Sequence, residues 1–336
     1  MNKLPLIAVT MGDPAGIGPE VTLEGLLGGP KFTDLPPVSV VVFGDIEVLE
    51  FINKKFNYNL ELEEINNIDE IEDEYVPGDV IKVLSISRLD PTKIKPGKLS
   101  PTCGKASFDY VDKAVDAALE EKVSGIVTGP VNKEAWLSAG VKYPGHTEYL
   151  RDRAGVDRVV MFMHHNKLRV GLVTHHIPIK DLLKNITQEK IIDTIKITYE
   201  GLKKMGFDPP KIAVAGLNPH AGEGGTMGTE EIEIIKPAME TAKQLGFPSE
   251  GPFAPDTVFH QAFDGQYDGV VSMYHDQGLG PLKLVHFDEV VNTTLGLPFV
   301  RTSVGHGTGF DIAQKGISDC TSFRWALTTA IQMVNG

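Results

Sequence analysis

The chain has 336 residues, 41% hydrophobic and 23% charged, which is typical of a folded globular protein and too long for one ordinary core. We therefore expect two domains. The net charge of −13 argues against a binding surface for nucleic acid or for an anionic membrane, and no apolar run approaches the roughly 20 residues that cross a bilayer.

The first thirteen residues, MNKLPLIAVTMGD, contain a short apolar run that is better interpreted as a first strand than as a secretory signal. The two cysteines, Cys103 and Cys320, are far apart and lie outside any CxxC motif, which argues against a disulfide framework or a cysteine zinc site. These features together predict a reduced, cytoplasmic, soluble protein without a membrane anchor.

Short apolar runs followed by Gly, Pro, His or Asn recur along the whole chain. Continuous rather than alternating apolar runs are typical of strands that are buried on both faces. The predicted strands are PLIAVT (5–10), VSVVVFG (38–44), SGIVTG (124–129), LRVGLVT (168–174), KIAVAG (211–216) and DGVVSM (268–273).

Helical periodicity lies between these runs, for example over residues 111–119 and 192–202. A third helix is predicted to begin at Thr229, with Glu230 and Glu231 in its first turn and Ile232 on its apolar face. Strands that alternate with helices predict an α/β fold with mostly parallel sheets.

Two glycine-rich stretches do not match the common nucleotide-binding motifs. In MGDPAGIGPE (11–20), Val21 occupies the place of the third glycine of G-x-G-x-x-G, and no Gly-Lys-Ser/Thr follows. The stretch GHGTGFDIAQKG (305–316) would let the backbone approach a nucleotide closely, although its spacing alone is a weak signal.

Three histidines each follow a predicted strand: His176, His220 and His275. Ligands of open α/β sheets bind beyond the carboxyl ends of the strands, so the three rings are expected to face one crevice. A set of three imidazoles suits Zn²⁺, Co²⁺ or Mn²⁺ and leaves coordination positions open for a substrate. Each histidine taken alone is more often a structural residue, and only the fold can bring the three together.

Other polar residues in the predicted loops are candidates for contacts to an anionic substrate. Lys and Arg would supply the local positive charge that a phosphorylated substrate needs in an acidic protein. Asp256 is a candidate ligand, a partner of a ligand or a proton relay, and Lys133 is either catalytic or merely lines the cleft. The candidates for substrate contact are His146, Thr147, Lys283, Asn292 and Arg301.

Long motifs near both ends and in the middle of the chain together resemble the 4-hydroxythreonine-4-phosphate dehydrogenase family of vitamin B6 biosynthesis. The motifs are GDPAGIGPE, GLNPHAGEGG, MYHDQG, NTTLGLPFVRTS and HGTGFDIAQKG. The last of these looks like the adenosine loop of isopropylmalate and isocitrate dehydrogenases. The resemblance covers nearly the whole chain.

The resemblance implies two α/β/α domains of the isocitrate/isopropylmalate dehydrogenase type, with the active site in the interdomain cleft. The first domain is expected to comprise residues 1–130 plus about 300–336. The second is expected to comprise about 131–299 and to carry the metal and dimer-interface elements. A homodimer whose protomers share the active site is also implied.

The implied reaction is oxidation and decarboxylation of 4-hydroxythreonine 4-phosphate to 3-amino-2-oxopropyl phosphate, with NAD (or NADP) and a divalent ion (Zn, Co, Mn or Mg). The family motifs place the metal ligands on His176, His220 and His275, and the substrate contacts on the five candidates given above. The adenosine-loop analogy offers His306, Gly307, Thr308 and Asp311 for NAD.

Two residues depart from the family pattern, and three further functions stay open. Gly305 stands where Asp is common, and Thr226 stands where His or Asn is frequent.

Motifs such as YPGHTE and PLKL look closer to a branch that oxidises phosphorylated threonate or erythronate. The histidines also permit an NAD-independent metal lyase or hydrolase of a phosphorylated sugar acid, and the two departures permit a catalytically inactive binding protein.

Overall fold

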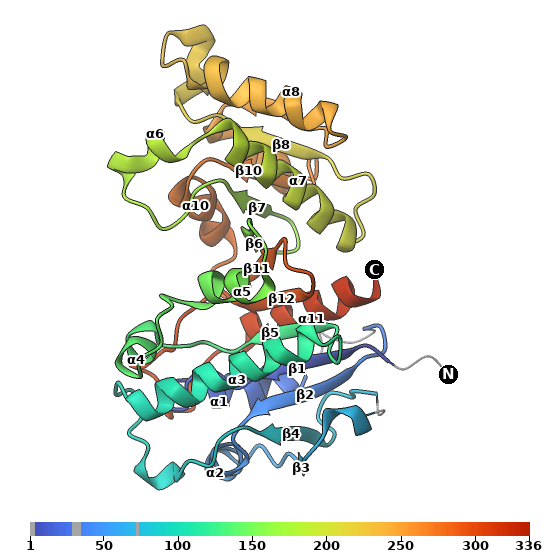
Figure 1. Ribbon diagram of the computed structural model, residues 1–336, viewed down its shortest axis with the longest axis vertical. Coiled ribbons are helices and arrows are strands. Elements are labelled where there is room, and N and C mark those ends of the chain that lie inside the picture. The colour runs from blue at the N-terminus through green and yellow to red at the C-terminus, as the bar shows by residue number, and fades with distance from the viewer. Residues whose placement is uncertain (1–3, 29–34, 72–73) are drawn as a thin grey trace. The chain divides into compact units, whose positions relative to one another are not determined.

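The computed structural model describes residues 4–28, 35–71 and 74–336. The chain forms two compact units (Figure 1): unit 1 is Met1–Val156 with Leu297–Asn335, and unit 2 is Asp157–Gly296 with Gly336. Residues 131–156, which the sequence analysis assigned to the second domain, thus belong to unit 1. They do so because helix α4 (Lys133–Ser138) and helix α5 (His146–Ala154) pack on helix α3 (Pro101–Leu119) of that unit.

Unit 1 is built on six parallel strands in the order β3-β4-β2-β1-β5-β12. All five residues of β1 and all four of β5 are buried, as expected for central strands covered on both faces. The strands are β1 (Leu6–Thr10), β2 (Ser39–Gly44), β3 (Leu62–Ile65), β4 (Ile81–Ser85), β5 (Gly125–Thr128) and β12 (Val300–Val304).

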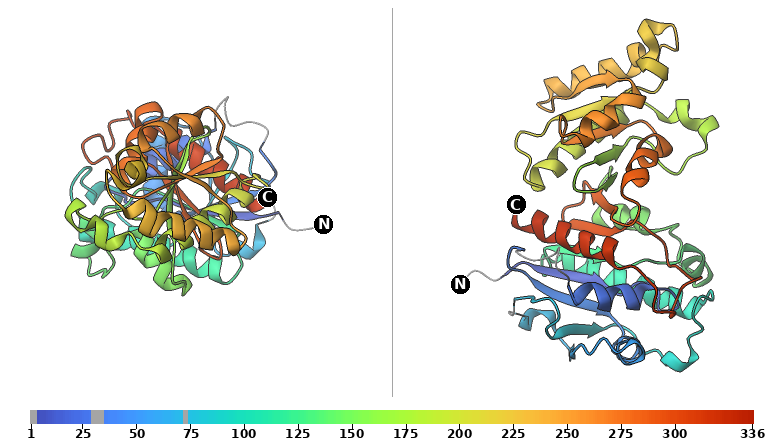
Figure 2. Two further views of the ribbon diagram at one scale, coloured as in Figure 1. Left: turned by 90° about the horizontal axis from the view of Figure 1, so that it is seen from above. Right: turned by 180° about the vertical axis from the view of Figure 1, so that it is seen from behind.

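Helices cover both faces of this sheet. Helix α3 lies on one face, and α1 and α11 lie together on the other (Figures 1 and 2). The Ser100 hydroxyl caps α3 by accepting from the Cys103 amide, and Pro101 occupies the first helical position, where no amide hydrogen is needed. The remaining elements are α1 (Gly18–Leu26), α2 (Ile46–Phe56), α11 (Thr321–Asn335) and the 3₁₀ turns η1 (Ile68–Glu70) and η2 (Pro91–Lys93).

Unit 2 has its own six strands in the order β11-β6-β7-β10-β8-β9. Strands β7, β10, β8 and β9 are parallel, whereas β6 is antiparallel to both β7 and β11. The prediction of an α/β fold with mostly parallel sheets is confirmed. The strands are β6 (Val160–His164), β7 (Arg169–Leu172), β8 (Ile212–Ala215), β9 (Glu250–Phe253), β10 (Gly269–Ser272) and β11 (Val291–Leu295).

In unit 2, α7 and α8 pack together, while α9 and α10 contact each other and the strands β10, β8 and β7 (Figures 1 and 2). The Thr187 hydroxyl caps α7 by accepting from the Lys190 amide. The elements are η3 (Ile179–Asp181), α6 (Leu182–Asn185), α7 (Gln188–Lys204), η4 (Pro219–Gly225), the π-helical η5 (Glu231–Ile235), α8 (Lys236–Gln244), α9 (Pro255–Phe263) and α10 (His275–Val285).

The helix predicted from Thr229 differs in the structure. Residues Glu231–Ile235 form one π-helical turn before α8 begins, and the side chain of Ile232 is 46% exposed rather than on the buried face. The wider π turn shifts the phase of the following residues, so that Ile235 and Met239 are buried as expected while Ile232 is not. No helix in the described ranges is long and apolar enough to span a membrane.

Candidate active site

The three predicted metal ligands follow three neighbouring parallel strands of unit 2. Strand β10 pairs with β7 on one side and with β8 on the other. His176 lies four residues after the end of β7 at Leu172, His275 three after the end of β10 at Ser272, and His220 five after the end of β8 at Ala215. The fold therefore brings all three to the carboxyl edge of one sheet.

Two of the three imidazoles lie side by side. The ring centroids of His176 and His275 are 5.6 Å apart, and their planes are inclined by 41°. Two imidazoles on one tetrahedral Zn²⁺ have centroids about 5 Å apart, given Zn–N bonds of about 2.1 Å. The Nδ1 atom of His275 lies 2.7 Å from the Asp276 carboxylate, a contact that orients its ring.

His220 lies in a loop of unusual backbone conformation. Residues 220–224 all have positive φ angles, from 39° at Glu223 to 76° at Gly222. A Cβ atom on Gly222 would lie 2.6 Å from the Glu231 Oε2 atom, so glycine is required there. In the described part of the chain, the three histidines do not all place ring nitrogens within 4.8 Å of one another.

Side chains that the sequence analysis did not select hold these three loops together. The Thr174 hydroxyl donates to the Met273 carbonyl (2.7 Å), which joins the end of β7 to the end of β10. The Gln277 side chain accepts from the Met273 amide (2.7 Å) and donates to the Gly216 carbonyl (2.6 Å), which joins β10 to the β8 loop. Gln277 was visible in the MYHDQG motif, but only the fold shows what it contacts.

Glu231 is the second side chain that supports the His220 loop. Its carboxylate accepts from the amides of Leu217 (2.7 Å) and Asn218 (2.8 Å) and from the Asn218 side chain (2.9 Å). Burial by itself raises the pKa of Glu231, but these hydrogen bonds outweigh it and the pKa lies below its usual value. The carboxylate therefore stays charged and anchors the start of the loop.

The other candidates of unit 2 lie on three different elements, α10, β11 and α9. Lys283 lies eight residues after His275 on α10, which is about 12 Å along the helix axis, and its ammonium group lies 5.5 Å from the centre of the Phe287 ring. Asn292 is on β11, paired with Met163 of β6. Asp256 is exposed in the first turn of α9. Helix α9, which begins with Pro255 and Asp256, contacts the η4 segment that carries His220.

Unit 1 brings together three predicted residues, Arg301, His146 and Lys133, two of which are cationic. Arg301, on β12, is 1% exposed, and it donates to the Thr128 hydroxyl at the end of β5 (2.6 Å). Burial, followed by the charges of Arg301 and Lys133, holds the pKa of His146 well below 6.5, so its imidazole is neutral. Burial also lowers the pKa of Arg301 to about 9, which still leaves the guanidinium charged at neutral pH.

The ring of His146 is held in place by its neighbours. It meets the Trp136 ring edge-on, with centroids 5.3 Å apart, and its Nε2 atom is buried without a hydrogen-bond partner among the described residues. His146 and Thr147 are the first two residues of α5, and the positive end of a helix favours an anion. A phosphate or carboxylate oxygen would satisfy the His146 donor.

The glycine-rich loop at residues 305–316 packs on the turn at residues 12–17. The Ile17 amide donates to the Thr308 carbonyl (2.9 Å), and a Cβ atom on Gly16 would lie 2.6 Å from that carbonyl oxygen. Glu20 accepts from the Gln314 amide (2.8 Å), which fixes the far side of the loop. Of the residues predicted to bind NAD, Thr308 is therefore buried in this contact, whereas Gly307 and Asp311 are exposed and His306 is half-buried.

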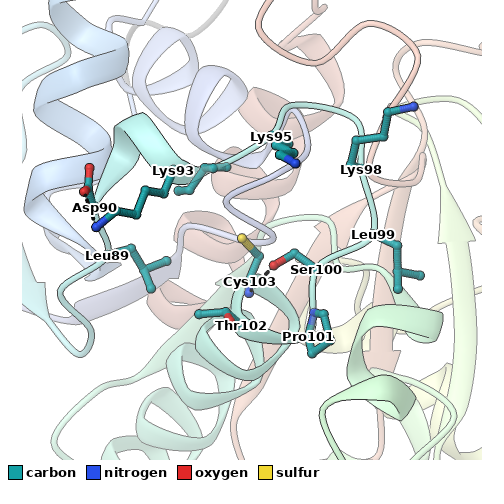
Figure 3. Close-up of a pocket in the computed structure, with 11 residues that line it drawn as sticks. Leu89, Asp90, Lys93, Lys95, Lys98, Leu99, Ser100, Pro101, Thr102 and Cys103 are labelled. Carbon is teal, nitrogen blue, oxygen red and sulfur yellow. Dashed lines mark hydrogen bonds and ion pairs between the residues drawn. The ribbon is translucent and has the colours of Figure 1, made fainter.

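A cavity of about 400 Å³ adjoins these loops and was not predicted (Figure 3). It is formed by the chain leading into α3 and by the first turn of that helix. Gly97 connects it to both glycine-rich segments, because its amide donates to Ala15 (2.8 Å) and a Cβ atom there would lie 2.2 Å from the Phe310 carbonyl. The polar residues in its lining include Asp90, Lys93, Lys95, Lys98, Ser100 and Thr102.

Comparison with known proteins shows which family this chain belongs to. The family model described as "Pyridoxal phosphate biosynthetic protein PdxA" matches residues 37–330. The chain belongs to the PdxA family. This match confirms the resemblance inferred from the motifs. The named relatives in this family are dehydrogenases.

The relatives carry two substrate names. A 4-hydroxythreonine-4-phosphate dehydrogenase of Desulforapulum autotrophicum is 44% identical, over 99% of this chain and 95% of the relative. A D-threonate 4-phosphate dehydrogenase of Pectobacterium atrosepticum is 42% identical, over 99% of this chain and 100% of the relative. The crystal structure of 4-hydroxythreonine-4-phosphate dehydrogenase from Klebsiella pneumoniae superposes with a TM-score of 0.87 at 40% identity, covering 98% and 99% of the two chains.

Proposed function

We propose that this PdxA-family enzyme oxidises and decarboxylates 4-hydroxythreonine 4-phosphate, yielding 3-amino-2-oxopropyl phosphate for pyridoxal 5′-phosphate biosynthesis, with NAD as hydride acceptor. The observation that carries the proposal is the placement of His176, His220 and His275 after three adjacent parallel strands, in a chain of this family. We further propose a cytoplasmic homodimer whose protomers share the active site.

The histidines suit a divalent ion of the first transition series. Imidazole is a preferred ligand of such ions, and the 5.6 Å between the His176 and His275 rings is close to the spacing that one ion requires. His220 would complete the set once ring nitrogens of all three histidines face the ion. When bound, the ion would supply Lewis-acid stabilisation of negative charge on the substrate oxygen.

The chain's own residues would bind the charged ends of the substrate and hold the reacting carbon. Arg301, His146 and Thr147 offer donors to a phosphate or carboxylate, and we assign Lys283 and Asn292 to the same substrate. The C3 hydroxyl loses its proton to a base, for which Asp256 and Lys133 are the candidates, and the C3 hydride passes to NAD. The product is a β-keto acid, so the C1–C2 bond breaks to release CO₂ and C2 takes up a proton.

The dinucleotide is assigned to the loop at residues 305–316. Its glycines let a ligand approach the backbone, and His306, Gly307 and Asp311 keep exposed atoms there. The neighbouring cavity supports this assignment, because Lys95 and Lys98 on its rim supply positive charge beside the loop in a protein of net charge −13 (Figure 3). Such charge favours the cofactor's pyrophosphate.

D-threonate 4-phosphate is the second candidate substrate. The relatives that bear the two names are almost equally similar to this chain, at 44% and 42% identity. The two substrates differ at C2, where threonate has a hydroxyl and hydroxythreonine has an amine. An enzyme built to pair with one of these groups rejects the other, so a direct comparison of kcat/KM distinguishes them.

The test combines a substrate panel with a ligand variant. The metal-loaded enzyme is assayed at 340 nm with NAD and with each phosphorylated acid, and we expect NADH and CO₂ in equal amounts. His275→Ala should lose the bound ion and at least about 100-fold in kcat, whereas the exposed His260→Ala should keep both. The absence of NADH with every substrate, or full metal content and turnover in His275→Ala, would refute the proposal.

A further inference from the structure

A group of side chains that could hold a metal ion lies in unit 2, separate from the three histidines discussed above. His165, His286 and Glu289 each offer one ligand atom, and these atoms lie within 4.8 Å of one another. It is the one such group of three or more His, Cys, Asp or Glu residues in residues 4–28, 35–71 and 74–336. None of the three is assigned a role in the proposed reaction.

The topology places this group away from the carboxyl edge that carries His176. His165 opens the turn that joins β6 to β7, where its amide donates to the Leu168 carbonyl (2.9 Å). His286 caps the end of α10, the helix that begins with His275, and Glu289 lies just before β11. Since β7 runs from this turn toward His176, the two groups lie at opposite ends of the strand.

The distances are close to those around a small divalent ion. The Glu289 Oε2 atom is 2.7 Å from His165 Nε2 and 3.5 Å from His286 Nδ1. Three ligands at about 2.1 Å from a tetrahedral Zn²⁺ are about 3.4 Å from one another. The two carboxylate–imidazole distances therefore bracket the separation that one ion needs.

The two imidazoles are stacked, with centroids 3.4 Å apart and planes inclined by 21°. Ligand lone pairs lie in the ring planes, so one ring must tilt before both nitrogens point at the same ion. His286 is the ring that can tilt, because its side chain is 20% exposed whereas that of His165 is 7% exposed. Glu289, at 27% exposed, gives the ion a path from solvent.

The types of ligand also suit a cation. Two imidazoles and one carboxylate match the ligand set of several catalytic zinc sites, and they leave one position for water.

We propose that His165, His286 and Glu289 form a second site for a divalent transition-metal ion, which ties the β6–β7 turn to the α10–β11 connection. The ion joins segments that are about 120 residues apart in the chain and fixes the end of α10. Its occupancy is independent of the ion proposed at His176, His220 and His275.

The site is tested by counting Zn²⁺ on the full chain after treatment with a chelator and dialysis against buffered Zn²⁺. In a His176→Ala/His275→Ala background, which removes the first proposed site, we expect one ion per chain to remain. Adding His286→Ala or Glu289→Gln should remove that ion or weaken its binding at least about 10-fold. His260→Ala, which changes an exposed histidine of α9, is the matched control.

Two readouts keep the test independent of folding and of the reaction. Co²⁺ in the same background should give the visible absorption of a tetrahedral complex, and Zn²⁺ should raise the unfolding temperature only while His286 and Glu289 are present. Circular dichroism of His286→Ala and Glu289→Gln verifies that both fold. Unchanged Zn²⁺ and Co²⁺ binding in both folded variants, or no ion in the background protein, would overturn this site whatever the outcome at the first.

Discussion

Asp13 shows how a single buried charge can set a pH dependence. It lies in the MGDPAG turn of unit 1, is 1% exposed, and accepts one hydrogen bond from the Ala15 amide (2.9 Å). Its Oδ2 atom has no hydrogen-bond partner among the described residues. Burial consequently raises the pKa of Asp13 from 3.8 to about 6, because a buried carboxylate without full hydrogen bonding is costly to ionise.

Asp13→Asn should stabilise the protein at pH 8. Between pH 3.8 and about 6 the folded state holds a proton that the unfolded state has lost, so the wild type becomes less stable as the pH rises through this window. The asparagine side chain keeps an oxygen that accepts from the Ala15 amide, but it has no carboxyl group to ionise. The expected gain is up to about 3 kcal/mol at pH 8 and shrinks as the pH falls toward 4.

Thermal unfolding midpoints of both proteins at several pH values from 4 to 8 measure this difference. The exposed Asp79→Asn serves as the control and should change the midpoint little at any pH. A gain for Asp13→Asn that is the same at pH 4 and pH 8 would contradict the assignment of the raised pKa.

At the scale of an element, the loop after β8 is held in a costly conformation by its surroundings. Non-glycine residues with positive φ, here His220, Ala221 and Glu223, each cost of the order of 1 kcal/mol or more. The hydrogen bonds that Glu231 accepts offset this cost and keep the chain turned toward the sheet edge. We therefore regard Glu231 as the residue that positions His220.

Glu231→Gln should weaken metal binding by about 10-fold without removing any ligand. The glutamine side chain retains one acceptor oxygen, but an NH₂ group replaces the other. This donor would face the donor of the Asn218 side chain, so their hydrogen bond is lost and the loop is held less tightly. Isothermal titration with Zn²⁺ measures the effect at the His176 edge, in a protein that also carries His286→Ala to remove the second proposed site. Glu233→Gln, in the same π turn but exposed, should bind Zn²⁺ as tightly as the parent.

At the scale of the whole molecule, the two units differ in how the chain builds them. Unit 2 is one continuous segment apart from the last residue, and it has its own core, in which one cluster alone contains fourteen buried residues, including Met161, Val170, Val270 and Leu282. Unit 1 needs both ends of the chain, because β12 pairs with β5 and α11 covers the sheet beside α1.

The segment 157–296 should fold alone, whereas the segment 1–156 should not. The first contains six paired strands and a closed core, while the second lacks β12 and α11 and exposes the apolar contacts of Phe323 and Ala326. Circular dichroism and cooperative urea unfolding of both fragments test the difference. Cooperative unfolding of 1–156, or its absence in 157–296, would contradict it.

The sequence alone determined the class of fold and the types of residue at the site. Continuous apolar runs such as GVVS and IAVA are buried on both faces, so the α/β class and the approximate strand positions followed from local pattern. The three histidines that follow strands were also predicted from the sequence, because the end of a strand and the residues after it are recognised from a short segment of chain. The family motifs added the expected role of each residue.

Only the tertiary structure decided which of these residues meet. The strand order β7-β10-β8 is not the order in the chain, and it makes His176 and His275 neighbours across 99 residues of sequence. Long-range packing likewise buries Arg301 beside Thr128 and stacks His165 on His286, contacts that no short-range pattern records. Hydrophobic periodicity specifies which face of each element is buried, whereas the partner of that face is set by the packing of the whole sheet.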